Sequence, residues 1–358
     1  MDTLLSESIL VYTPDRLPAL IKQIGQPAFR AKQLMQWLYR HGAASYDDMG
    51  NLPRAMREEL ARVAPLTPPT VVDTQISEDG TRKFLLQLAD GNQVETVAIP
   101  SRDTGEDGQP RRLTVCFSTQ VGCSMGCAFC ATGQEGYTRN LLPGEMAWEL
   151  LICQREMGMR VSNAVAMGQG EPFLNYDNVM GALHIMNHPE GLAIGARHIS
   201  VSTCGILQGI ERFGNEPEQF TLAVSLHSAI QKVRDRLMPQ CVSMPLAALH
   251  DAIDVYQHAC NRRVTFEYLM IKDVTDTEES LKALLRFCED LDSHVNLLRI
   301  NEVDGSPFHP TTVERMGRFS NALEKNGISA TVRDSRGADI DGACGQLKNK
   351  TSQGTQPA

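Results

Sequence analysis

The sequence predicts an α/β protein, built as a partial (β/α)6 barrel with a small N-terminal accessory domain of helices and antiparallel strands. Three observations support this fold class. Six β-rich runs alternate with helical patterns from residue 112 onwards, three short β-rich runs precede them, and the first sixty residues have helical periodicity. Alternating β and α units form a parallel sheet whose right-handed crossovers place the helices outside it. Six units are two fewer than a closed eight-stranded barrel contains, so we expect a part-open barrel.

The first part of the predicted accessory domain, residues 1–100, is helical and locally basic. In Arg30–Arg40, Leu34 and Trp37 fall on one face at helical spacing. From Lys22 to Arg62, seven Lys and Arg stand against four Asp and Glu, which gives +3 in a chain whose formal net charge is −9. This excess fits either an RNA-binding surface or an ordinary solvated helical face, and the sequence leaves both open.

The second part of the accessory domain is expected to be an antiparallel meander. Its three β-rich runs, at 70–76, 82–88 and 93–99, are separated by two Asp-Gly turns. Residues 101–111 are polar and contain Gly and Pro, so we expect a linker there. The core then spans 112–337, a C-terminal segment spans 338–350, and 351–358 read as a disordered tail.

The core is predicted to contain six strands joined by helices. Helical patterns over 175–188, 246–258 and 278–291 lie between strand-like runs. In a parallel barrel or open sheet, chemistry gathers at the C-terminal ends of the strands. The predicted strands lie near 112–119, 161–168, 198–203, 219–227, 263–271 and 294–301.

The composition and the first residues of the sequence predict where in the cell the protein works. The chain of 358 residues has no run of about eighteen apolar residues, so we expect no membrane span. The first seven residues carry acids where a signal peptide carries positive charge, which predicts a cytoplasmic protein. There its ten cysteines should be thiols, metal ligands or redox catalysts rather than structural disulfides. A net charge of −9 argues against a protein that coats polyanions, although a local basic patch can still bind nucleic acid.

The most specific motif is a group of three cysteines, Cys123, Cys127 and Cys130, directly after the first core strand. Thiols at spacings of four and three converge from one loop onto a single [4Fe-4S] cluster. A zinc site usually has four ligands in two pairs, and no second Cys or His pair follows at the usual distance. A dithiol redox pair would need only Cys127 and Cys130, which leaves Cys123 unexplained. The pattern therefore favours the cluster.

Three protein ligands leave the fourth iron open to an exogenous ligand. S-Adenosylmethionine is the natural candidate, because its amino and carboxylate groups can chelate iron. An electron from the cluster then cleaves a carbon–sulfur bond of the sulfonium and yields a 5′-deoxyadenosyl radical.

Polar residues stand at the C-terminal ends of four of the predicted strands. Glycines there allow the backbone to approach a ligand, and a carboxylate can receive an ammonium group. Each such residue could instead cap the following helix, although four polar strand ends on one rim favour a binding site. These residues are Gly170 and Glu171 in Met167-Gly-Gln-Gly-Glu-Pro172 at the end of the second strand, Ser202 at the end of the third, Ser225 and His227 at the end of the fourth, and Asn301 at the end of the sixth.

Seven cysteines lie outside the three-cysteine motif. Buried cysteine usually behaves as a small hydrophobe, so each one taken singly is expected to be inert. Cys116 in the first core strand and Cys344 near the C-terminus stand in distinctive surroundings, whereas the other five, at 153, 204, 241, 260 and 288, do not.

Taken together, these motifs resemble the RlmN/Cfr family of radical-SAM RNA methyltransferases. The resemblance covers nearly the whole chain and is most specific at the two outlying cysteines. The matching stretches are Phe29-Arg-Ala-Lys-Gln33, Val94-Glu-Thr-Val97, Cys116-Phe-Ser-Thr-Gln-Val-Gly-Cys123, Met167–Pro172, Ser225-Leu-His227 and Asp339-Ile-Asp-Gly-Ala-Cys-Gly-Gln-Leu347.

The resemblance implies a mechanism with two S-adenosylmethionine molecules per turnover. Cys344 takes a methyl group from the first, and the second provides the radical that activates the S-methyl group for addition to adenine. Glu95 is implied to be the proton acceptor, and Cys116 attacks the Cys344 sulfur to release the product as a disulfide. The implied cofactor contacts are Gly170, Glu171, Ser202, Ser225, Leu226, His227 and Asn301.

The resemblance also implies substrates and partners. We expect methylation of C2 of adenosine at position 2503 of 23S rRNA and position 37 of tRNA, by a monomer supplied with electrons by flavodoxin or ferredoxin. Two alternatives stay open. One is methylation at C8, as in Cfr, and the other is a non-catalytic iron–sulfur RNA-binding redox sensor, which would not need both Cys116 and Cys344.

Overall fold

The computed structural model describes residues 8–301 and 306–349. The N-terminal residues that argue against a signal peptide, the last residue of the predicted C-terminal segment and the predicted tail at 351–358 lie outside this range. No helix of the described chain is long and apolar enough to cross a membrane.

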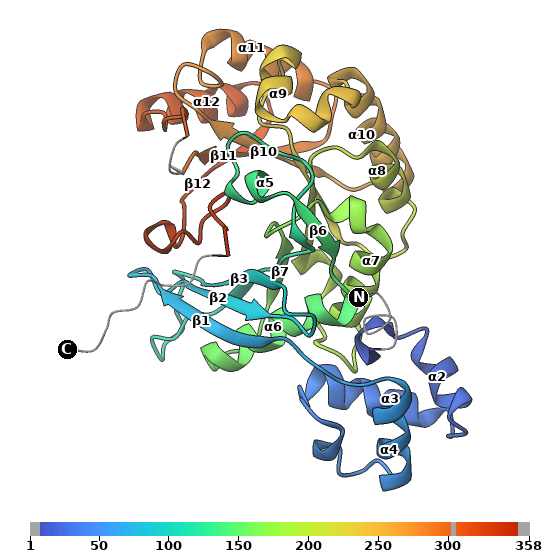
Figure 1. Ribbon diagram of the computed structural model, residues 1–358. Helices are drawn as coiled ribbons and strands as arrows, with labels where there is room; N and C mark the ends of the chain where they lie inside the picture. The colour runs from blue at the N-terminus through green and yellow to red at the C-terminus, as the bar shows by residue number, and fades with distance from the viewer. Residues whose placement is uncertain (1–7, 302–305, 350–358) are drawn as a thin grey trace, which may run out of the picture.

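The N-terminal part is helical, as predicted, and forms the lower lobe in Figure 1. Leu34 and Leu38 are fully buried and Trp37 partly buried, so the expected apolar face packs inward. The helix predicted over 30–40 continues through its last turn in π-helical form at Gln36–Arg40. The elements are η1 (Ile9–Val11), α2 (Leu17–Gln23), α3 (Phe29–Met35), η2 (Gln36–Arg40), η3 (Tyr46–Asp48) and α4 (Arg54–Val63).

The basic residues of these helices are largely paired. Five of the seven Lys and Arg between Lys22 and Arg62 have a carboxylate partner within 4.0 Å, and three of those partners lie in the same stretch of chain. Most of these pairs are exposed, so each stabilises the fold weakly and can exchange with another anion.

One ten-stranded sheet runs through the rest of the molecule, in the order β1-β2-β3-β4-β7-β8-β9-β10-β11-β12. The first four strands pair antiparallel, and each pair from β4 to β12 is parallel. A separate hairpin joins β5 (Gln120–Gly122) to β6 (Tyr137–Asn140). The ten strands are β1 (Thr70–Ile76), β2 (Arg82–Gln87), β3 (Gln93–Pro100), β4 (Leu113–Cys116), β7 (Asn163–Ala166), β8 (Ile199–Thr203), β9 (Thr221–Ser225), β10 (Val264–Met270), β11 (Ser293–Arg299) and β12 (Ser329–Arg333).

The meander and the core share this sheet. The predicted meander is present as β1–β3, and β3 pairs with β4 in the register Val97↔Cys116. Residues 101–111, where we expected a linker, form the loop that connects these two paired strands. The pairing brings the backbone around Glu95 close to the first strand of the barrel.

The α/β class and the open barrel are confirmed, but the barrel contains seven parallel strands, not the six expected. The additional strand, β12, follows α12 and pairs with β11. Its burial pattern shows no buried position, because it lies at the edge of the sheet. A short edge strand has neither an apolar run nor a clear alternation, so its sequence carries little strand signal.

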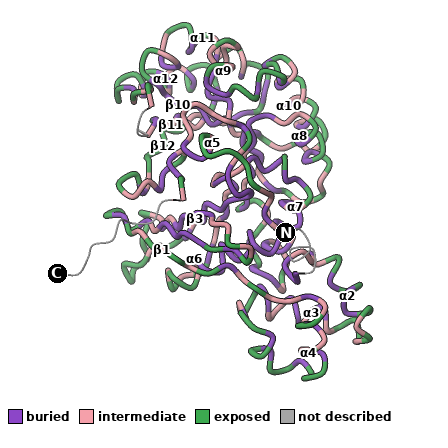
Figure 2. The backbone as a smooth tube through the Cα atoms, in the orientation of Figure 1, coloured by how far each residue is buried: buried purple, intermediate pink, exposed green. Residues whose placement is uncertain are grey.

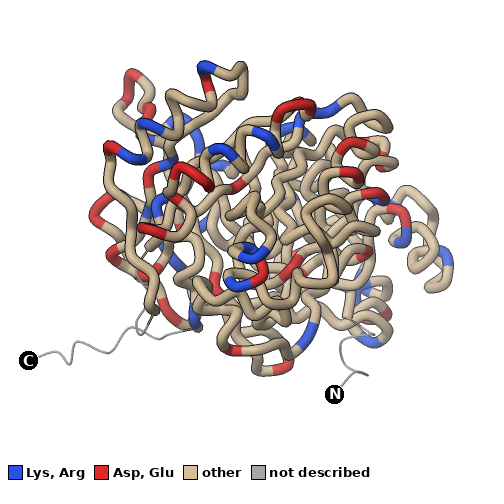
Figure 3. The backbone as a smooth tube through the Cα atoms, turned by 90° about the horizontal axis from the view of Figure 1, so that it is seen from above, with Lys and Arg blue, Asp and Glu red and all other residues tan. Residues whose placement is uncertain are grey.

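Helices cover the outside of the parallel strands, and the apolar core lies between the two layers (Figures 1 and 2). The three helices predicted in the core are confirmed as α7, α10 and α11, with ends shifted by up to three residues. Acidic and basic segments are interspersed around the exterior (Figure 3). The remaining elements are α5 (Ala131–Glu135), α6 (Pro143–Met157), η4 (Pro172–Asn175), α7 (Tyr176–Asn187), η5 (Ala196–His198), α8 (Leu207–Gly214), α9 (Gln231–Leu237), η6 (Pro239–Ser243), α10 (Leu246–Cys260), α11 (Glu278–Cys288), α12 (Val313–Lys325) and η7 (Ala338–Ile340).

Candidate active site in the barrel mouth

The three-cysteine loop begins where β5 ends in a sharp turn. Gly122 has φ +72°, and a Cβ atom there would lie 1.9 Å from the carbonyl oxygen of Gly136. The amide of Cys123 donates to that same oxygen at 2.8 Å. Only glycine fits such a close approach of two backbones, so the β5–β6 hairpin determines where Cys123 lies.

The rest of the loop is fixed by backbone hydrogen bonds to two distant parts of the chain. The amide of Ala128 donates to Leu237 O at 2.9 Å, at the end of α9. The amide of Ala131, the first residue of α5, donates to Gly345 O at 2.8 Å. Cys127 and Cys130 are therefore held between the barrel helices and the C-terminal segment.

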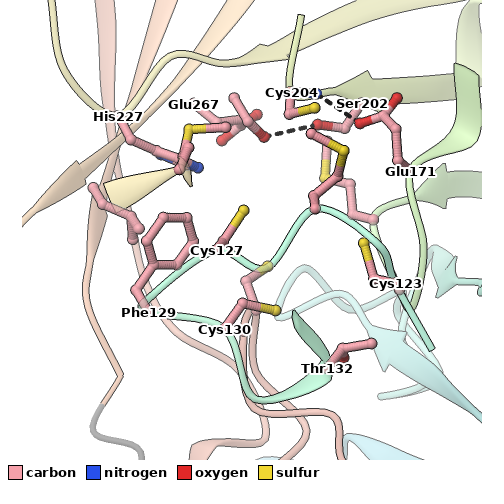
Figure 4. A pocket seen from close by; sticks show the side chains of 18 of the residues that line it. Cys123, Cys127, Phe129, Cys130, Thr132, Glu171, Ser202, Cys204, His227 and Glu267 are labelled. Carbon is pink, nitrogen blue, oxygen red and sulfur yellow. Dashed lines mark hydrogen bonds between the residues drawn. The ribbon is translucent and has the colours of Figure 1, made fainter. Parts of the chain in front are cut away.

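All three cysteines line one cavity of about 170 Å³ at the C-terminal ends of the strands, here named the mouth cavity. Figure 4 shows their side chains around it. Within the described chain, the only three potential ligands that lie within 4.8 Å of one another are His184, Glu216 and Glu218, on the outside of the barrel. The sulfurs of Cys123, Cys127 and Cys130 are thus too widely spaced to hold a single ion as they stand, which fits a larger cluster.

The electrostatics of these thiols also fit a cationic metal cluster. Burial raises the pKa of Cys123 to about 11 and raises the pKa values of Cys127 and Cys130 as well. Thiolates are the form that binds iron, and burial disfavours that form unless a positive charge compensates it. Bound iron would supply this charge, so the residues present suit a [4Fe-4S] cluster.

Glu171 follows β7 and lines the mouth cavity, on the same side as Cys123 in Figure 4. Its Oε1 accepts from the amide of Phe173 at 3.0 Å and its Oε2 from the amide of Cys204 at 2.8 Å. Burial raises its pKa. At Gly170, with φ +105°, a Cβ would lie 2.7 Å from Thr119 Oγ1, so a side chain would collide with the wall of the site.

The other predicted strand-end residues also converge here, with one exception. Ser202, Ser225, His227 and Asn301 line the mouth cavity. The Oγ atoms of Ser202 and Ser225 are 3.3 Å apart. Burial lowers the pKa of His227 to about 3, so its imidazole is neutral at pH 7. The side chain of Leu226 is fully buried in the core, and Leu226 does not line the cavity.

Cys116 and Cys344 lie on a second cavity of about 340 Å³ that extends into the barrel, here named the inner cavity. Cys344 lines both cavities and is an exposed residue. Asn301 Nδ2 donates to the backbone carbonyl oxygen of Cys344 at 3.3 Å. Desolvation by the surrounding protein, and next the charge of Glu267, raise the pKa of Cys344 to about 11, and burial raises that of Cys116 well above its usual value.

Glu95 lines neither cavity. Its Oε1 lies 3.1 Å from Lys83 Nζ, and its Oε2 accepts from the amide of Lys348 at 2.8 Å. Gln169 adds a bridge, because its Oε1 accepts from the amide of Glu95 at 3.1 Å and its Nε2 donates to Asn349 Oδ1 at 3.0 Å. Glu95 therefore fastens the C-terminal segment to β3 in this conformation.

The sequence did not lead us to predict two charged residues near the site, Lys83 and Glu267. Lys83 is buried in β2 and pairs with Glu95, and Glu267 in β10 lines both cavities. A signal existed in each case, since a charged residue stands among apolar neighbours of a strand: Phe84, Leu85 and Leu86 after Lys83, and Val264, Phe266 and Tyr268 around Glu267.

Comparisons with known proteins cover nearly the whole chain. A model of the "Ribosomal RNA large subunit methyltransferase N-terminal domain" matches residues 8–66, and a model of the "Radical SAM superfamily" matches 117–288. A Clostridium perfringens protein named "Probable dual-specificity RNA methyltransferase RlmN" is 41% identical to this chain, with 96% of each covered. The chain belongs to the RlmN family of radical SAM RNA methyltransferases.

Two further similar proteins agree with this assignment. A Moorella thermoacetica protein that carries the same name is 43% identical, with 94% of this chain and 95% of that protein covered. The crystal structure of a radical SAM methyltransferase from Sphaerobacter thermophilus is 42% identical, superposes with a TM-score of 0.88, and covers 96% of this chain and 99% of its own. As a radical SAM protein, this RlmN-family chain is expected to bind an iron–sulfur cluster and S-adenosylmethionine.

Proposed function

We propose that this protein methylates C2 of adenosine at position 2503 of 23S rRNA and at position 37 of tRNA, using two S-adenosylmethionine molecules per turnover and an S-methylcysteine at Cys344. The observation that carries the proposal is that Cys344 lines both the mouth cavity and the inner cavity, and that Cys116 lines the inner one. The names of the relatives, which describe dual-specificity RNA methyltransferases, support two RNA substrates.

In this proposal the residues of the mouth cavity hold the cofactors. Cys123, Cys127 and Cys130 bind a [4Fe-4S] cluster, and Glu171 receives the ammonium group of S-adenosylmethionine. When bound, the cluster supplies the electron that generates the radical. The other contacts to S-adenosylmethionine are proposed to come from Gly170, Ser202, Ser225, Leu226, His227 and Asn301, of which Leu226 can contribute only its backbone.

The two outlying cysteines do the covalent chemistry. Cys344 carries the methyl group to the base and so becomes joined to the RNA. Cys116 then attacks the Cys344 sulfur, forms a disulfide and frees the product, and a thiol reductant restores both residues. Glu95 is the proposed acceptor of the proton that leaves the base. It lies behind the C-terminal segment, so this role requires residues 346–349 to shift when RNA binds.

The proposal includes a monomeric protein in the cytoplasm, with flavodoxin or ferredoxin as electron donor and RNA held in part by the N-terminal helices. The exposed ion pairs of those helices are compatible with RNA binding, since phosphates can replace surface carboxylates.

Mass spectrometry of rRNA and tRNA from a strain without this gene tests the proposal. We expect 2-methyladenosine to disappear from both RNAs and to return when the gene is restored. Persistence of 2-methyladenosine would refute the proposal, and loss of 8-methyladenosine in its place would indicate C8 chemistry.

The Cys344→Ala and Cys116→Ala variants test the covalent steps. Cys344→Ala should keep about four irons per chain and lose methylation. Cys116→Ala should accumulate protein covalently joined to RNA, visible as a slow band that ribonuclease removes. A Cys344→Ala protein that still methylates RNA would contradict the covalent mechanism, and normal behaviour of both variants in cells would point to a sensor.

A further inference from the structure

Glu267 stands in the polar wall that the two cavities share. It lies on β10, opposite Ser225 of β9 in the strand register, and lines both cavities together with Asn301 and Cys344. Only 7% of it is exposed, and Figure 4 shows its carboxylate directed into the mouth cavity. Its Oε1 accepts from Asn296 Nδ2 at 2.8 Å, and no donor of the described chain bonds to its Oε2.

The Cys344 thiol requires a proton acceptor to react as a nucleophile at neutral pH. With a pKa of about 11, roughly one molecule in 10⁴ would carry the thiolate at neutral pH. Three groups interact electrostatically with this thiol: Glu267 most strongly, then Arg333 of β12 and Cys130 of the cluster loop. Glu267 is the carboxylate among them. Burial raises its pKa, which makes it a stronger proton acceptor than an exposed carboxylate, and the nearby Arg333 acts in the opposite direction.

The other carboxylates near the site are already engaged. Both oxygens of Glu171 accept from backbone amides, and both oxygens of Glu95 are held by Lys83 and by the amide of Lys348. Asp334 lines only the inner cavity and pairs with Arg102. Glu267 thus combines a free oxygen with a place on both cavities.

We propose that Glu267 is the base that takes the thiol proton of Cys344 when this sulfur accepts its methyl group. The proton passes to Oε2 of Glu267, directly or through one water. The sulfur lone pair of Cys344 forms a bond to the methyl carbon of S-adenosylmethionine, and the sulfonium–methyl bond breaks with its electrons left on the departing thioether. The cation, the carboxylate and the thiol become three neutral groups. This inference rests on the proposed function, since it assumes that Cys344 is methylated.

The Glu267→Gln variant tests the proposal, because the amide keeps an oxygen to accept from Asn296 and cannot take the proton. The assay uses cluster-loaded protein with a free Cys344 thiol, kept anaerobic without reductant or RNA. Saturating S-adenosylmethionine with a trideuterated methyl group is added, and label on Cys344 is followed by mass spectrometry. A second measurement follows alkylation of Cys344 by iodoacetamide against pH.

In Glu267→Gln, the rate of alkylation of Cys344 and the rate of methyl transfer to it should change in opposite directions. Loss of the Glu267 charge lowers the thiol pKa, so alkylation at neutral pH becomes faster. Methyl transfer at neutral pH becomes slower by about 10² or more, and recovers about tenfold per pH unit as hydroxide replaces the lost base. A purely electrostatic or structural role would change both rates in the same direction.

Glu149→Gln is the matched control, since Glu149 is a fully buried carboxyl that lines neither cavity. The Glu149→Gln variant should transfer the methyl group to Cys344 at the wild-type rate. Transfer by Glu267→Gln at the wild-type rate would overturn the proposal, as would a loss that alkaline pH does not restore. If wild-type Cys344 takes no methyl group at all, the proposed function itself fails, together with this inference.

Discussion

Replacement of Lys83 by Met should release the C-terminal segment that carries Cys344. Lys83 and Glu95 are 3% and 0% exposed, and Nζ lies 3.1 Å from Oε1. Lys83 Nζ also donates to Asp341 O at 3.3 Å. Methionine keeps the apolar stem of lysine and removes the charge, so the Glu95 carboxylate loses its Lys83 partner and keeps the backbone amides of Lys348 and Asn349.

Removal of one partner from a buried pair costs about 3 kcal/mol, because the remaining charge is neither solvated nor paired. Solvent does not screen this ion pair, since both side chains are buried. We therefore expect the free energy of unfolding to fall by about 3 kcal/mol at neutral pH.

The loss should depend on pH. Burial raises the pKa of Glu95 above its ordinary value of 4.5 in the folded protein. The folded state therefore holds this proton to higher pH than the unfolded chain does, and stability decreases as the pH rises from about 4.5 towards the folded pKa. Without Lys83 the folded pKa rises further, so the difference between variant and wild type should be small in acid and largest at neutral pH.

Urea denaturation of cluster-free protein at several pH values, followed by the fluorescence of buried Trp148, measures this difference. Hydrogen exchange of residues 341–348 should accelerate in the same variant. In the double variant Lys83→Met/Glu95→Gln neither charge remains, and we expect it to regain at least half of the loss. A loss below about 1 kcal/mol that does not vary with pH, or a double variant as unstable as the single one, would refute the reasoning.

Two further substitutions test how the backbone holds the site. Gly122→Ala should lower bound iron severely, because its Cβ would lie 1.9 Å from Gly136 O. The control Gly25→Ala has a similar φ of +71° with nothing within 4 Å, and it should bind iron normally; equal iron in the two variants would contradict this account. Gln169→Met should cost about 1–3 kcal/mol in urea denaturation, since the buried amide of Glu95 loses its acceptor. An unchanged midpoint would show that this hydrogen bond contributes nothing.

Much of the barrel was predictable because its signals are local. The six parallel strands β4 and β7–β11 are β-rich and mostly buried or half-buried, and their ends were predicted within a few residues. The edge strand β12 lacks such a pattern, and its role in completing the sheet depends on its partner β11. The continuity of the meander with the barrel also escaped prediction, since the pairing of β3 with β4 spans a polar loop that resembles a linker.

The sequence by itself determined the cluster loop and the strand-end residues of the mouth cavity. Both follow from short spacings and from the rule that parallel strands present their C-terminal ends at one rim. Only the tertiary structure decided that Cys116 and Cys344 share a cavity, that Lys83 pairs with Glu95, and that Glu267 lines the same two cavities as Cys344. These relations join residues far apart in the chain, and burial and charge pairing depend on what surrounds a side chain in space, which no local pattern records.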